Sequence, residues 1–181
     1  MKIIAKLILR IFGWTVKVTV PEYPQCIICV APHTSNWDFV LGKLAYLSVG
    51  RKAGFLMKET WFFFPLNYLF KVMGGIPVPR NKKGSELTET IIQMYNNSSE
   101  LKLAITPEGT RKRVEKWRSG IIHIAVGAKI PIVMAYIDYK RKHIGITEVY
   151  TPIGDVEVDM KHIKNFYSNV NAKYPECFCI D

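Results

Sequence analysis

Apolar runs with strand character alternate with helix-length segments along nearly the whole chain, and this alternation constrains the fold more than any other feature. The expected strands cover residues 14–20, 26–32, 54–58, 101–107, 130–140 and 143–153. They are rich in β-branched and aromatic residues, as strands usually are. The pattern is typical of an α/β protein, so we expect one mixed sheet that is covered by helices.

The helix-length segments between these runs cover residues 2–12, 37–49, 61–74, 85–97, 121–129 and 158–172. The third of them is expected to be helical and deeply packed. Its large side chains are interpreted as core residues, with one wall of an acyl channel as the alternative: Trp61, Phe62, Phe63, Phe64, Tyr68 and Leu69. Residues 74–80 contain two prolines, which restricts them to an edge strand or a loop.

The size and composition of the chain indicate one folded domain. Its 181 residues, of which 49% are hydrophobic, are enough to close a core without disulfide bonds. No linker, repeat or low-complexity tract divides the sequence. We therefore expect a domain over residues 15–181 with an N-terminal appendage over residues 1–14.

The chain is strongly basic. Its 25 Lys and Arg residues against 15 Asp and Glu residues give a formal net charge of +10, which suits nucleic acid, an anionic membrane surface or a phosphorylated substrate. The sequence has no zinc-finger, RNP-like or helix-turn-helix pattern, so we expect no nucleic acid among its partners. No apolar stretch reaches the roughly 18 to 20 residues of a spanning helix, so we expect no transmembrane helix.

Four cysteines form a CxxC pair, Cys26 and Cys29, and a CxC pair, Cys177 and Cys179, which raises the possibility of a zinc site. The first pair lies in a strand-like run, where alternation directs the two thiols to opposite faces of the sheet. We interpret the cysteines as buried reduced thiols and expect no metal site.

Residues 2–12 are expected to form a short amphipathic helix in which Lys2, Lys6 and Arg10 follow one another at four-residue spacing. Two of these cations interrupt the apolar region and no cleavage site follows, so we expect the segment to stay on the mature protein rather than to act as a secretory signal. A helix of this length measures only ~18 Å. We expect it to lie on the anionic cytoplasmic face of a membrane as a peripheral anchor; the alternative is that its apolar side packs on the domain.

The stretch "APHTSNWD", residues 31–38, places His33 directly after an apolar run and Asp38 five residues later. A histidine can accept a proton at neutral pH, and a carboxylate bonded to its other ring nitrogen fixes its tautomer. The alternative is an ordinary polar turn in which Ser35 or Asn36 caps a helix. The chain has no GxSxG motif and no cysteine beside a histidine, so an attacking hydroxyl would have to belong to the substrate.

Two further polar loops follow expected strands, at the sheet edge where α/β proteins place their sites. "TPEGTR", residues 106–111, contains a turn at Gly109 that is expected to expose backbone N–H groups beside Arg111, which can bind a phosphate through two N–H groups. Arg80, at the end of 74–80, offers a second guanidinium. Both could instead be surface arginines. The rest of the basic run that ends at Arg118 is interpreted as a solvated face.

Four blocks in this order resemble the glycerophospholipid acyltransferase family, in particular the lysophosphatidic acid acyltransferases. They are "HTSNWD" at 33–38, "GGIPVPR" at 74–80, "PEGTR" at 107–111 and "IPIV" at 130–133, and the likeness runs from about residue 26 to 138. The resemblance implies a glycerolipid acyltransferase-like α/β fold. It also implies that His33 is the catalytic base, that Asp38 orients it, and that the glycerol phosphate is bound by Arg80, Glu108, Gly109, Thr110 and Arg111.

The resemblance further implies direct acyl transfer from the thioester of coenzyme A or acyl carrier protein to the hydroxyl of a lysophospholipid. The expected acceptor is 1-acylglycerol-3-phosphate and the product phosphatidic acid, with no cofactor beyond the thioester co-substrate. Another lysolipid or an aminolipid is an alternative acceptor. A non-catalytic basic module that binds lipid or nucleic acid is the distant alternative, against which the intact His33 and Asp38 argue.

Overall fold

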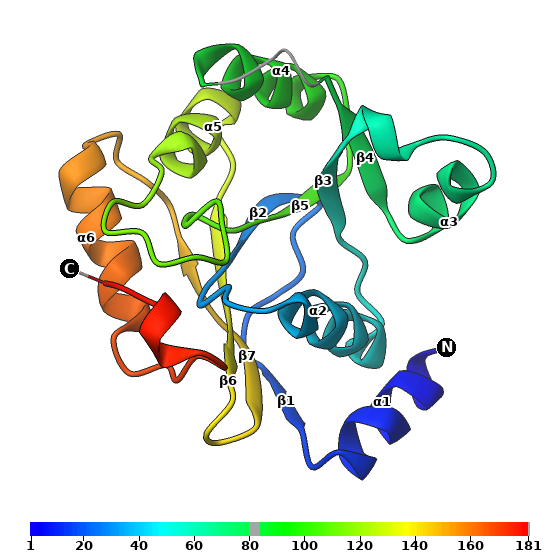
Figure 1. The fold of residues 1–181 in the computed structure, drawn as a ribbon. Coiled ribbons are helices and arrows are strands. Elements are labelled where there is room, and N and C mark those ends of the chain that lie inside the picture. The colour runs from blue at the N-terminus through cyan, green and yellow to red at the C-terminus, as the bar shows by residue number, and fades with distance from the viewer. Residues whose placement is uncertain (80–83, 181) are drawn as a thin grey trace.

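The computed structural model describes residues 1–79 and 84–180 (Figure 1). The strands in these residues form one sheet in the order β1-β7-β6-β2-β5-β3-β4. Their bounds are β1 Thr15–Val18, β2 Gln25–Val30, β3 Gly54–Lys58, β4 Gly75–Val78, β5 Leu101–Ile105, β6 Ile132–Asp138 and β7 His143–Tyr150. The helices are α1 Lys2–Ile11, α2 Asn36–Val49, α3 Leu66–Val72, α4 Ser85–Asn96, α5 Gly120–Ala128 and α6 Val156–Tyr167, with 3₁₀ turns η1 Glu59–Trp61 and η2 Pro175–Cys177.

The sheet is mixed, which confirms the expected fold class. β6 and β7 pair antiparallel, as neighbours joined by a short connection can, and the remaining pairs are parallel. β4 lies at one edge, where it pairs with β3 alone. Pro77 is tolerated there because an edge strand does not need every N–H group. The prediction of an edge strand or loop for residues 74–80 is thus confirmed for residues 75–78.

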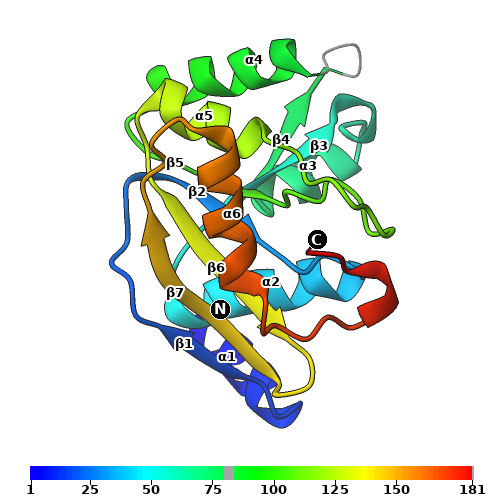
Figure 2. The same cartoon turned by 90° about the vertical axis from the view of Figure 1, so that its left-hand side faces the viewer.

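Alternate side chains of β2 reach two different helical layers. Ile27 and Cys29 lie in a cluster with α4, α5 and α6, whereas Cys26 and Ile28 lie in a second cluster that includes Tyr46 of α2. Figures 1 and 2 show these two layers on opposite sides of the sheet. The prediction that the CxxC thiols point to opposite faces is therefore confirmed. Burial raises the pKa of Cys26 to about 11 and that of Cys29 to about 12, so both thiols stay protonated at neutral pH.

Helix α1 buries one side and exposes another apolar side. Ala5 and Leu9 are buried, and Leu9 belongs to a cluster with Leu41 and Ala45 of α2. Ile8 is half-buried, and the other large apolar side chains at this end are exposed: Met1, Ile3, Ile4, Leu7, Ile11 and Phe12. Packing on the domain thus accounts for only part of the apolar surface of α1. In the described residues, no helix is both long and apolar enough to cross a membrane.

The segment 61–74 differs from its expected structure. Only Leu66–Val72 is α-helical, and neither η1 nor α3 contains a buried residue. Pro65 precedes the helix, and a proline has no N–H group with which a helix could continue through it. The segment joins β3 to the edge strand β4, so no further layer covers it. The prediction that this aromatic stretch belongs to the core is wrong.

Candidate active site

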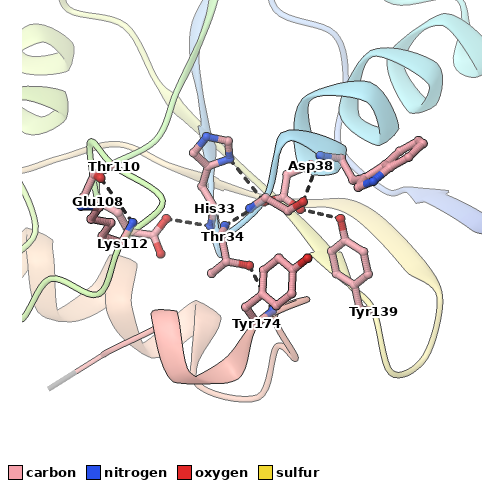
Figure 3. Close-up of polar contacts among 10 residues, drawn as sticks. His33, Thr34, Asp38, Glu108, Thr110, Lys112, Tyr139 and Tyr174 are labelled. Carbon is pink, nitrogen blue, oxygen red and sulfur yellow. Dashed lines mark hydrogen bonds and ion pairs between the residues drawn. The ribbon is translucent and has the colours of Figure 1, made fainter.

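The two motif loops meet because the strands before them are neighbours. β2 and β5 run parallel, with Cys29 opposite Ile105, so the loops that follow them leave the sheet at the same edge. The backbone N–H of His33 donates a 2.7 Å hydrogen bond to Oε2 of Glu108 (Figure 3). "APHTSNWD" and "PEGTR", which lie 75 residues apart in the chain, therefore form one site.

The beginning of α2 fixes the carboxylate of Asp38. Ser35 is the N-cap and Asp38 is the third helical residue, and the two form a capping box in which the carboxylate accepts from the backbone of Ser35. Oδ2 of Asp38 accepts 2.8 Å hydrogen bonds from the N–H groups of both Thr34 and Ser35. These bonds hold the side chain in one orientation, so the helix-cap interpretation of this stretch is correct.

The histidine pairs with the same carboxylate. His33 Nδ1 lies 3.4 Å from Oδ2 of Asp38, while the hydroxyl of Tyr139 donates a 2.5 Å hydrogen bond to Oδ1 (Figure 3). Burial alone raises the pKa of Asp38, but hydrogen bonds from His33, Tyr139 and Ser35 outweigh it and lower the pKa below its usual value. An ionised Asp38 can therefore orient the ring and stabilise an imidazolium. The same carboxylate of Asp38 thus caps helix α2 and pairs with His33, so the two interpretations of residues 31–38 hold together.

Glu108 is buried behind His33 rather than turned toward solvent. Burial, together with the negative charge of Asp38, raises its pKa to about 7 against the opposing effect of the hydrogen bond from the His33 N–H. The side chain links the PEGTR turn to the histidine backbone. Glu108 therefore fixes the backbone of His33 through this hydrogen bond.

The rest of the PEGTR turn is more exposed. Gly109 has a φ of +66°, and its N–H donates to the carbonyl of Thr106, so the expected free N–H at this residue is not found. Thr110 accepts a 3.3 Å bond from the N–H of Lys112 (Figure 3). Arg111 is exposed. Arg80 lies outside the described residues.

Arg118 occupies the position that the sequence suggested for Arg111. Its side chain lies across the turn at Gly109, where an added Cβ would be 2.6 Å from its Nε atom. Glycine is thus required both by the positive φ and by this close approach. Arg118 and Gly109 line the same cavity as His33 and Asp38. Arg118 is exposed, as expected for part of a solvated face, and it also lines this cavity, which the sequence did not indicate.

The cavity has a volume of ≈ 490 Å³ and lies between α2 and the sheet. Its walls are mostly apolar side chains from the strands, such as Ile28 and Phe55, and from α2, such as Phe39. Lys43 also lines it, but its Nζ atom is engaged by the carbonyl of Ala53 at 3.0 Å. The side chain of His33 thus lines a cavity whose apolar walls suit an apolar ligand.

Sequence reasoning missed two residues of this site, Tyr139 and Arg118. Tyr139 follows β6 and reaches Asp38 across 101 positions of the chain. No local pattern marks it, because the contact depends on β6 lying beside β2. The one sequence signal for Arg118 is Gly109, because a glycine in a turn leaves space in which a large side chain can lie. Among residues 1–79 and 84–180, no group of three or more His, Cys, Asp or Glu side chains could hold a metal ion.

Comparison of the chain with known protein families and solved structures agrees with this geometry. Residues 15–138 match the model of the Acyltransferase family, which covers more than half of the chain, so the chain belongs to this family of acyltransferases. Among solved structures, it is similar to the 1-acyl-sn-glycerophosphate (LPA) acyltransferase PlsC from Thermotoga maritima, with a TM-score of 0.56 over 94% of this chain and 80% of that chain. The two are 17% identical, a level at which the likeness shows a shared fold. No curated protein matches the sequence.

Proposed function

We propose that this acyltransferase moves a fatty acyl group from the thioester of coenzyme A or acyl carrier protein to the free hydroxyl of a lysophospholipid. The proposed acceptor is 1-acylglycerol-3-phosphate, which gives phosphatidic acid. The observation that carries the proposal is the His33–Asp38 pair, whose Nδ1–Oδ2 distance is 3.4 Å, at the wall of an apolar cavity. The PlsC neighbour, named as an LPA acyltransferase, supports the choice of acceptor.

In the proposed reaction His33 acts as a general base. With Nδ1 directed at Asp38, Nε2 takes the proton of the lysolipid hydroxyl as its oxygen attacks the thioester carbonyl carbon. The carbon–sulfur bond then breaks, and the proton passes from Nε2 to the departing thiolate. Asp38 stabilises the imidazolium between these steps. The apolar cavity of ≈ 490 Å³ takes the acyl chain.

Arginines near the PEGTR turn bind the phosphate of the acceptor in this proposal. Arg118 does so from the cavity wall and Arg111 from the PEGTR turn, and Arg80, which lies outside the described residues, is proposed as a third guanidinium. A hydrogen bond to a charged group contributes about 1.5–3 kcal/mol, so Arg118→Ala should raise the KM for the phosphate-bearing acceptor ~10- to 100-fold with the thioester KM unchanged. Lysine should rescue this only in part, because it lacks the planar fork.

Arg113→Ala is a matched control, because that guanidinium lies in the same loop but contacts Sγ of Cys179. A variant of Arg118 or Arg111 that changes only the thioester KM would show that the arginine binds the donor instead.

The direct test of the proposed function is product identification. Purified protein is incubated with labelled lysophosphatidic acid, other lysophospholipids and an aminolipid, each with acyl coenzyme A and acyl carrier protein as donors. Phosphatidic acid should form faster than any other product, and His33→Ala should lower its rate of formation at least ~10²-fold. Transfer to every acceptor but lysophosphatidic acid would contradict the assignment of the acceptor while keeping the class of reaction.

The exposed side of α1 supports peripheral attachment to the cytoplasmic face of a membrane. Lys2, Lys6 and Arg10 are all exposed, and each cation near an anionic surface contributes about 1 kcal/mol. Changing the three cations to glutamate should release the protein from anionic vesicles. Deleting α1 is a poorer test, because it would also remove Leu9 from the cluster that it forms with α2. Unchanged vesicle binding of the folded triple variant would show that attachment does not depend on these charges.

A further inference from the structure

The segment between β3 and β4 exposes an unusual amount of apolar surface. Its six exposed large side chains are called here the aromatic lobe: Trp61, Phe63, Phe64, Tyr68, Leu69 and Val72. Phe64 is 79% exposed and Val72 is 86% exposed, which places them among the most exposed hydrophobic residues of the described chain. Patches of this kind on a soluble surface usually mark a contact site.

The aromatic lobe is a folded element rather than a loose loop. Phe62 and Phe70 turn inward, with their ring centroids 5.9 Å apart, and Phe62 also approaches Gly75 at the start of β4. Backbone hydrogen bonds close the turns on both sides of Pro65, among them the bond from the N–H of Asn67 to the carbonyl of Phe63. The inward rings fix the backbone while the exposed side chains of the lobe point away from it.

The composition of the lobe fits the interface of a lipid bilayer. Trp61 and Tyr68 have amphipathic rings of the kind that concentrate at the level of lipid headgroups. Two exposed cations, Lys58 and Lys71, flank the apolar side chains, and Glu59 is the one acidic residue between positions 58 and 73. Apolar side chains beside cations are complementary to an anionic membrane surface.

The position of the lobe also relates it to α1 and to the cavity. Figure 1 shows α3 and α1 on the same side of the molecule, opposite α6. Phe55 and Leu56 of β3 line the cavity, and the lobe begins directly after that strand ends at Lys58. A membrane that contacts both α1 and the lobe would therefore lie close to the end of β3, the strand whose side chains line the cavity.

We propose that the aromatic lobe enters the lipid interface and forms, with α1, a second point of membrane contact that directs the catalytic cavity toward the bilayer. This inference rests on the proposed function, since it assumes a lipid acceptor supplied by a membrane. Two contacts fix the orientation of a protein on a surface, which a single amphipathic helix does not.

The test is co-sedimentation with vesicles of phosphatidylcholine and phosphatidylglycerol. The variant combines Phe64→Ser and Val72→Ser, because both side chains are almost fully exposed and their loss should not disturb folding. Its partition coefficient should fall about tenfold, in proportion to the apolar area withdrawn from the lipid. The matched control combines Ile153→Ser and Val158→Ser. Both side chains are exposed and apolar but lie away from the lobe, Ile153 before α6 and Val158 within it. The control should bind as the unchanged protein does.

A second readout locates the lobe in the membrane. Brominated lipids quench tryptophans that lie in the bilayer, so Trp61→Phe should remove a large part of the quenching seen with the unchanged protein. Equal vesicle binding by the lobe variant and the control, or equal quenching with and without Trp61, would overturn the proposal. So would a change in oligomeric mass of the lobe variant without a change in vesicle binding, because the lobe would then contact protein.

Turnover of a water-soluble short-chain lysophosphatidate separates this inference from the proposed function. The lobe variant should turn it over at the normal rate. If no variant and not even the unchanged protein transfers an acyl group, the proposed function fails while the vesicle result still decides the role of the lobe.

Discussion

Two buried aspartates near the beginnings of helices, Asp38 in α2 and Asp159 in α6, are held in nearly the same way. Each accepts hydrogen bonds from two consecutive backbone N–H groups of the loop before its helix. Each also accepts a 2.5 Å hydrogen bond from a tyrosine hydroxyl, that of Tyr139 for Asp38 and that of Tyr150 for Asp159. Both carboxylates thereby fix a strand-to-helix connection.

The difference between the two regions is the histidine. His33 Nδ1 lies 3.4 Å from Asp38 and the ring lines the cavity. His162, on α6, instead stacks on Tyr150 with ring centroids 4.0 Å apart and contacts Glu148 at 2.7 Å. The carboxylate held by backbone and tyrosine is therefore a structural arrangement that the protein uses twice. Only at Asp38 does a histidine that lines the cavity contact the carboxylate.

The largest expected effect separates the two histidines. His33→Ala should lower turnover roughly 10²- to 10⁴-fold, the usual loss when a positioned general base is removed, and leave the fold intact. His162→Ala should leave turnover unchanged, because its ring lies outside the cavity. Steady-state kinetics with a soluble substrate measure both. Near-normal turnover by folded His33→Ala would contradict the mechanism.

The next effect separates the two aspartates. In Asp38→Asn the backbone donors should hold the amide oxygen toward His33, so the main loss is the negative charge that stabilises the imidazolium. Turnover should therefore fall ~10²-fold or more, and the acidic limb of the pH–rate profile should move to lower pH.

Asp159→Asn provides the comparison, since it should reduce the melting temperature while the turnover of the folded protein stays normal. Equal losses of turnover in the two asparagine variants would mean that Asp38 acts through folding alone.

A smaller effect separates the two tyrosines. Tyr139→Phe and Tyr150→Phe each remove one hydrogen bond to a carboxylate, so both should lose about 1.5–3 kcal/mol of unfolding free energy. Only Tyr139→Phe should alter catalysis, within about tenfold. Because the Tyr139 bond lowers the pKa of Asp38, its loss makes the carboxylate more basic and should move the acidic limb of the pH–rate profile to higher pH. An unchanged profile would show that Tyr139 serves stability alone.

The smallest effect on turnover is expected for Glu108→Gln, which keeps an acceptor for the His33 N–H. Burial raises the pKa of Glu108 from 4.5 to about 7, so the folded state binds the proton more tightly than the unfolded state. Between these pH values the unfolding free energy of the unchanged protein should therefore fall as pH rises, by about 3 kcal/mol at most.

Denaturant unfolding at several pH values should show this fall in the unchanged protein and not in the glutamine variant. Glu157→Gln, on the exposed side of α6, is the control that should keep it. Parallel curves for Glu108→Gln and the unchanged protein would contradict the raised pKa.

The fold was largely predictable because its strands are marked by local composition. The runs 130–140 and 143–153 were expected as strands and contain β6 and β7, which pair with each other, and the sheet has the expected mixed character. The exposure of residues 61–74 was not predictable, because hydrophobicity shows only that a side chain avoids water. It does not show whether another layer of the protein is present to cover it.

The site was predictable where its contacts are local and not where they are long-range. His33 and Asp38 lie five residues apart, so a single turn determines their meeting. The contact of Tyr139 with Asp38 depends on which strands become neighbours, and the position of Arg118 depends on the path of a loop. His123 shows the same limit: it lies within the apolar sequence of helix α5, yet it faces solvent and contacts Ser119.

The capping box at Ser35 and Asp38 makes the arrangement of His33 and Asp38 transferable between proteins. One residue inserted between them would rotate the carboxylate about 100° around the axis of α2, so that it would lose the backbone donors and the histidine together. Their spacing is therefore set by helix geometry, not by the remainder of this fold. A designer could graft residues 33–38 onto another strand-to-helix junction and need supply only a tyrosine, an acceptor for the histidine N–H and an apolar cavity.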